Sequence, residues 1–323
     1  MKNKIQFFRI LLLTVLSTVM LNGCKKSNDN DMSTGSDETA ELRSNAEDEL
    51  RVSNDVDDLM NEVNEVALTN KRFMGMNAMP FLSGNHIPCN AVIDSSLMSQ
   101  GTIIITFNGN NCGGNRTRTG SITLQLPYDA TSNTVTPWTT AGCVLTVTFS
   151  QYRITKMMNG KSITFNGSKQ ITNVNGGLVD DATSFITPIV HRITGMMQIT
   201  FDNNTTRTWN IDRTRTIERT NNLTTIAITG NATANGISNV AMWGINRKGN
   251  SFTVSIPTPV VLNSACSFNA ISGVRILQGL VRVLTVTYGV DQSGNVVSSG
   301  CPFGYRLNWI NKQGNPVQVI IAY

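Results

Sequence analysis

The feature that most constrains this chain is an alternation of apolar and polar side chains with a period of two, which begins beyond Phe81. The alternation is most regular at residues 121–126, 145–150 and 252–256. Successive side chains of a β-strand point to opposite faces, and no useful length of helical repeat follows Asn70. The sequence therefore predicts an all-β, mostly antiparallel body with one apolar face and one face of threonine and asparagine.

An aliphatic-Thr-aromatic triplet recurs in the body, at spacings too irregular for a solenoid or a propeller. The first and last triplets lie between pairs of cysteines, as if a cystine-stapled β unit occurred near each end. Two architectures fit this pattern. One is a pair of β lobes, about 81–180 and 190–323, and the other is a single sandwich or open-barrel body over residues 71–323.

Charge divides the chain into two regions. Residues 27–70 contain 13 acids and two arginines, whereas residues 71–323 contain 19 lysines and arginines and eight acids. The net charges are therefore −11 and +11. With 40% hydrophobic and 15% charged residues, the chain has the composition of one or two globular domains, not of a disordered or nucleic-acid-packaging protein.

The N-terminus has the pattern of a signal peptide. Three basic residues precede an uncharged apolar run over residues 10–21, which is too short to span a bilayer of about 30 Å. The run ends in Leu21-Asn22-Gly23-Cys24, which resembles the lipobox of bacterial lipoproteins. The resemblance implies that residues 1–23 are removed and that Cys24 is acylated, so the lipid bilayer is the first expected partner.

The residues that follow Cys24, from Lys25 to Asp31, resemble the export tag of surface lipoproteins of the Bacteroidota. This resemblance implies an outer-membrane lipoprotein, displayed on the surface or facing the periplasm. Residues 24–54 are expected to form an acidic flexible tether. An apolar stripe at helical spacing then predicts an amphipathic helix over 55–70, which we expect to dock on the body.

An exported chain meets oxidising conditions, so its cysteines are first interpreted as disulfides. Proximity in sequence predicts the pairs Cys89–Cys112 and Cys266–Cys301. Cys143 is in phase with an apolar strand face and is expected to be a buried thiol. The two histidines lack enough partners for a metal site, and the sequence predicts no cofactor.

The candidate ligand-binding residues are arginines and tryptophans. Along residues 207–219 the odd positions include four arginines and Trp209, so a single strand would place Arg213 and Arg215 beside an indole. Such a face could bind a glycan or an anionic polymer. Alternatively, it is an edge strand whose arginines oppose aggregation or meet the acidic segment. Trp138, on a loop after Pro137, could stack on a sugar or cap the core.

Catalytic patterns are sparse in this chain. The body has eight acids that the sequence cannot bring together, and neither a G-x-S-x-G elbow nor an H-E-x-x-H helix occurs. We therefore expect a non-enzymatic binding or scaffold protein, with no nucleic-acid partner because the chain is exported. A glycan-active or other hydrolytic lipoprotein is the alternative. The ligand and the oligomeric state cannot be inferred from the sequence.

Overall fold

The computed structural model describes residues 66, 73, 88–179, 185–246, 248–279 and 282–323. Most of these residues lie in strands, and none of the described segments contains a helix long and apolar enough to cross a membrane. The first nine elements are β1 (Ala91–Asp94), η1 (Met98–Gln100), β2 (Thr102–Asn110), β3 (Arg116–Gln125), β4 (Tyr128–Asp129), β5 (Thr134–Val135), β6 (Cys143–Lys156), β7 (Ser162–Asn173) and β8 (Ile189–Phe201). The others are β9 (Thr206–Thr220), β10 (Leu223–Gly230), β11 (Ala232–Ala234), β12 (Ile237–Ile245), β13 (Ser251–Asn263), η2 (Ser264–Cys266), β14 (Ala270–Gln278), β15 (Leu284–Val290), β16 (Gly304–Ile310) and β17 (Pro316–Ala322).

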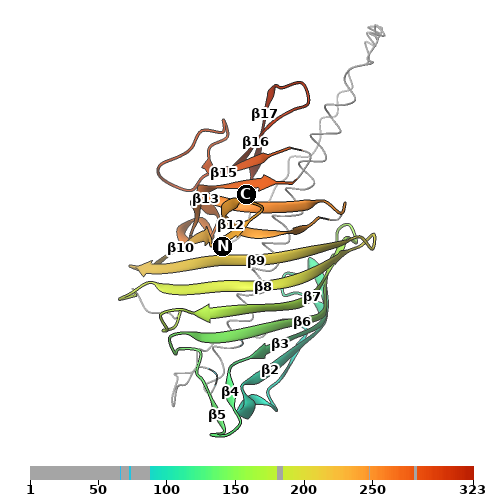
Figure 1. The fold of residues 1–323 in the computed structure, drawn as a ribbon, viewed down its shortest axis with the longest axis vertical. Helices are drawn as coiled ribbons and strands as arrows, with labels where there is room; N and C mark the ends of the chain where they lie inside the picture. Colours follow the sequence, from blue (N-terminus) through green and yellow to red (C-terminus); the bar gives the residue numbers. More distant parts are fainter. Residues whose placement is uncertain (1–65, 67–72, 74–87, 180–184, 247, 280–281) are drawn as a thin grey trace, which may run out of the picture.

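The strands form one 15-stranded sheet and a separate small hairpin of β4 and β5. The large sheet follows the chain in a meander, and its strands pair antiparallel (Figure 1). The predicted all-β, antiparallel class is therefore confirmed. Two lobes and a single body were the alternatives for this region. β7 and β8, which lie on either side of the suggested division, pair along their length, from Ile163 opposite Phe201 to Asn173 opposite His191.

One position in the sheet is shared by two strands. The second half of β9 pairs with β10, and its first half pairs with β12. β13 likewise pairs with both. Between β10 and β12 the chain forms the short hairpin of β11 with the start of β12. Asn231, the residue before β11, donates hydrogen bonds to side chains of β9. The β11 hairpin therefore leaves the sheet on the face to which those side chains point.

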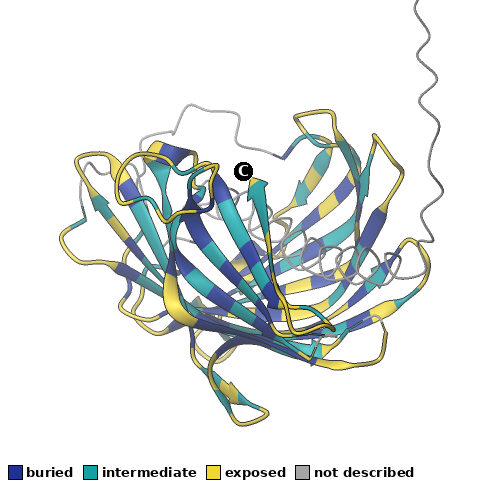
Figure 2. Cartoon of the chain, turned by 90° about the horizontal axis from the view of Figure 1, so that it is seen from above, coloured by how far each residue is buried: buried dark blue, intermediate teal, exposed yellow. Residues whose placement is uncertain are grey.

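Figure 2 shows that the sheet is strongly curved. A curved sheet shields its inward face from water, so we assign the face that carries the buried core residues to the concave side. Buried apolar residues from β2 through β16 form one cluster, although these strands are far apart in the sheet order. Two residues that precede the sheet, Val66 and Phe73, belong to the same cluster, with exposures of 3% and 0%. Both are helical. The rest of the predicted helix over 55–70, the signal peptide and the tether lie outside the described residues.

The curvature has a local cause in three neighbouring strands. Gly120 of β3 has φ +90°, and a Cβ there would lie 2.1 Å from the carbonyl oxygen of Gln151. Gln151 itself sits at a register shift of β6 with φ +49°. Gly167 of β7 has φ +120°, and its Cβ would lie 2.5 Å from the Met196 carbonyl oxygen. A bulge flanked by two such glycines lets the strands bend together.

Both predicted cystines are present. Cys89–Cys112 joins the two ends of the β1–β2 hairpin, and Cys266–Cys301 joins η2 to the segment before β16. In the chain-entropy description, closing loops of 23 and 35 residues stabilises the fold by roughly 3 to 4 kcal/mol each. Cys143 is a free, buried thiol as expected, and burial raises its pKa to about 11.

The bend can be tested at Gly167. Gly167→Ala should destabilise the protein by about 3 kcal/mol or more. An alanine there would have to adopt an unfavourable positive φ, and its Cβ would clash with the Met196 carbonyl oxygen. Gly160→Ala is the matched control, since Gly160 also has positive φ (+67°) but nothing lies within 4 Å of its Cβ. That control should cost only about 1 kcal/mol. Urea unfolding measures both, and equal losses would show that close approach at Gly167 is unimportant.

Candidate functional site

The predicted row of arginines lies on one strand and faces the core. β9 covers the whole stretch, and Arg207, Trp209 and Arg213 are 6%, 0% and 1% exposed. Arg215 is half-buried on the same face. β9 is an interior strand between β8 and the pair β10 and β12, so the edge-strand interpretation was wrong. The alternation was visible in the sequence, whereas the position of the strand within the sheet was not.

Most of the buried cations lie over aromatic rings. The distances from the charged group to the ring centroid are 4.8 Å for Arg118 over Phe107, 4.7 Å for Lys169 over Trp209, 4.3 Å for Arg207 over Phe252 and 5.5 Å for Arg275 over Tyr288. A desolvated pair of this kind contributes about 2 kcal/mol, whereas burying a cation costs several kcal/mol. The rings therefore offset part of the cost of burying these cations.

Trp138 caps one end of the concave face. Its side chain is 4% exposed and its ring centroid lies 5.3 Å from that of His191. The backbone around it is held on both sides, because its N–H donates to the Phe73 carbonyl (3.0 Å) and its carbonyl accepts from the Asn173 amide (3.0 Å). His191 pairs across the strands with Arg215. The fold thus gathers Trp138, Arg215 and the row of β9 on one face, but it does not present Trp138 to solvent.

The convex face offers a different surface. Of the four tryptophans in the sequence, all described, Trp243 of β12 is the one that is not buried. It pairs across the strands with Asn210, whose other neighbour is Met196, 62% exposed. Ile245, two residues further along β12, is 40% exposed. We call Met196, Asn210, Trp243 and Ile245 the convex patch.

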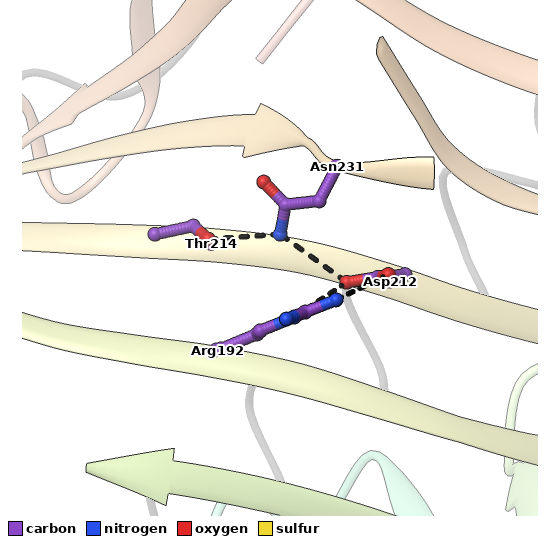
Figure 3. A network of polar contacts seen from close by, with 4 residues as sticks. All are labelled: Arg192, Asp212, Thr214 and Asn231. Atoms are coloured by element: carbon purple, nitrogen blue, oxygen red, sulfur yellow. Dashed lines mark hydrogen bonds and ion pairs between the residues drawn. The ribbon is translucent and has the colours of Figure 1, made fainter. Parts of the chain in front are cut away.

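A polar network borders the convex patch (Figure 3). Asp212 follows Asn210 by two residues and so lies on the same face of β9. Its carboxylate accepts two hydrogen bonds from Arg192, at 3.1 and 3.0 Å, and one from the Asn231 amide at 3.2 Å. Asn231 also donates to the Thr214 hydroxyl at 2.9 Å. The ion pair raises the pKa of Arg192, chiefly through the hydrogen bonds to Asp212. The network is close to neutral and fixes its side chains in place.

The sequence reasoning missed this surface. Trp243 lies in Ala-Met-Trp-Gly, where no clean alternation marks one side chain as outward-facing. Among the described residues no group of three histidines, cysteines or acids could hold a metal ion. Cys24 and the adjacent acids Asp180 and Asp181 lie outside the described residues. The chain matches no family model, no curated protein and no solved structure.

The burial of His191 predicts a pH dependence of stability. Burial and then the charge of Arg215 lower the pKa of His191 from 6.5 to about 4. Between pH 6.5 and pH 4 this histidine is protonated in the unfolded chain but neutral in the folded protein. The free energy of unfolding is therefore unaffected by His191 above pH 6.5 and decreases as the pH falls below it. From pH 7 to pH 5 the titration of His191 should lower the free energy of unfolding by about 2 kcal/mol. In His191→Gln that part of the loss should disappear in urea titrations, and an unchanged pH dependence would contradict it.

Proposed function

We propose that this protein is an exported outer-membrane lipoprotein, anchored through acylated Cys24, that binds a glycan on the convex face of its sheet. Surface display is proposed over a periplasmic orientation because of the residues that follow Cys24. The observation that carries the binding role is the placement of the four tryptophans. Three are buried, whereas Trp243 is half-buried beside Asn210 and the exposed side chains of Met196 and Ile245.

The chemistry of the convex patch suits a sugar ring. An indole presents a large apolar face that stacks on the C–H face of a sugar, while its edge remains polar. Asn210 lies beside it, and Arg192, Asp212 and Asn231 supply donors and acceptors of fixed geometry for hydroxyl groups. Because Arg192 is paired with Asp212, the patch favours a neutral glycan over an anionic polymer.

The same network supports binding without turnover. A glycosidase needs a pair of carboxyl groups about 5 to 10 Å apart, one of them protonated. The Asp212 carboxylate already accepts two hydrogen bonds from Arg192 and one from the Asn231 amide, so it is held in a polar network and has no second carboxyl group as a described partner. A hydrolytic lipoprotein stays the second candidate in the test below, although no described residue favours it specifically.

Trp243→Ala tests the proposed function. In native gels that contain a neutral xylan, a neutral α-glucan or an acidic pectin, we expect one of the neutral polymers to retard the unaltered protein. The substitution should lower that affinity at least tenfold, about 1.4 kcal/mol. Because the patch is close to neutral, raising the salt concentration should change the affinity little.

Met158→Ala is the matched control, since Met158 is 92% exposed in the turn between β6 and β7. Equal affinities for Trp243→Ala and the unaltered protein would contradict the proposed site. Hydrolysis of any polymer that is lost in Asp212→Asn would replace binding with catalysis. The anchor is tested separately by palmitate labelling, which should be lost in Cys24→Ser.

A further inference from the structure

The two outermost strands of the described sheet differ in how their free edges are protected. The strand order begins at β1 and ends at β17, so each has one side that no described strand pairs with. Proteins usually protect such edges by short strands, charges or prolines. β1 has only four residues and ends at the exposed Asp94. β17 has seven residues, and no side chain from Gly314 to Tyr323 is charged, so Pro316 at its first position is the one protecting residue.

The hydrogen bonds of β17 show which of its backbone groups face away from β16. The Tyr323 N–H donates to the Phe303 carbonyl of the neighbouring chain segment at 3.2 Å. In an antiparallel strand the N–H and C=O groups of successive residues alternate between its two sides. The odd-numbered residues of β17 therefore bond to β16. The backbone groups of Gln318, Ile320 and Ala322 point outward, where they can pair with a further strand.

The apolar core extends to β17 and is only half-covered there. Leu307 and Trp309 of β16 are 0% and 4% exposed. Val319 and Val317, which pair with them on β17, pack against the same core cluster but are half-buried. Ile321 is half-buried on the same side. A strand added beyond β17, with apolar side chains on its core side, would remove these three aliphatic residues from water.

We propose that β17 is a homodimer interface, at which the β17 strands of two copies pair antiparallel about a two-fold axis. Residues opposite each other in antiparallel strands share a face, so odd-numbered residues must lie opposite odd-numbered ones. A register centred on Ile320 meets this condition. It places Val319 opposite Ile321, which continues the apolar face into the partner, and it leaves Pro316, which lacks an N–H, outside the paired residues.

The features of β17 favour a second copy over other occupants of this edge. Pairing of a strand with itself satisfies both edges at once, and an uncharged strand meets no like-charge repulsion when it does so. β1 of another copy is a poorer match because it is shorter and ends at Asp94. The inference is independent of the proposed function, because Trp243 lies on β12 and not on this edge of the sheet.

Sedimentation velocity of residues 24–323 carrying Cys24→Ser, which removes the lipid attachment site, tests the proposal. A contact of one strand per copy is small, so we expect a reversible dimer with a dissociation constant in the micromolar range. Gln318 and Ala322 lie opposite each other in the proposed register, and both are exposed in the single copy. Gln318→Lys/Ala322→Lys places lysines opposite lysines and should weaken dimerisation at least tenfold.

The matched control is Gln318→Glu/Ala322→Lys, which changes the same two positions but places opposite charges across the two-fold axis. It should dimerise at least as tightly as the unaltered protein, while urea unfolding checks that both variants are folded. A monomer at every concentration of the unaltered protein, a measurement that needs no variant, would overturn the proposal and leave the edge to a different strand. Equal dissociation constants for the two double variants would also overturn it, because these residues would then not face each other.

Discussion

The structure depends on the bending of a single antiparallel sheet. A flat sheet of these strands would leave its apolar face in water, since few other described elements could cover it. Buried apolar residues from β2 to β16 form one core cluster, and bending turns the face that carries them into an interior. The bend relies on backbone geometry at Gly120, Gln151 and Gly167, where side chains or a regular register would prevent the strands from approaching.

Curvature also decides the roles of the two faces. Basic side chains that would be ordinary surface residues on a flat sheet become buried on the concave side, over aromatic rings. Their charged groups lie 4.7 Å from the Trp209 ring for Lys169 and 4.3 Å from the Phe252 ring for Arg207. The convex side keeps short polar side chains, the Arg192–Asp212 network and one accessible indole. The core and the proposed glycan-binding patch thus lie on opposite faces of the sheet.

Local patterns in the sequence predicted local structure well. The period of two identified the strands, proximity identified both cystines, and the alternation in β9 placed its arginines on one face. The error concerns long-range pairing, because the interior position of β9 is not encoded nearby in the chain. For the same reason the sequence left two lobes and one body open, since it does not show that β7 pairs with β8. Trp138 follows a proline in a Thr-rich loop and is buried, whereas Trp243 lies in a mostly apolar stretch and is half-buried, so neither exposure could be predicted from the local sequence.

The central claim is that the arginine-bearing face is an interior while the face of Trp243 meets solvent. Fluorine NMR of the protein labelled with 5-fluorotryptophan tests this directly, because each of the four tryptophans gives its own resonance. A soluble gadolinium chelate should broaden the Trp243 resonance and leave those of Trp138, Trp209 and Trp309 sharp. Broadening of the Trp209 resonance comparable to that of Trp243 would contradict the account.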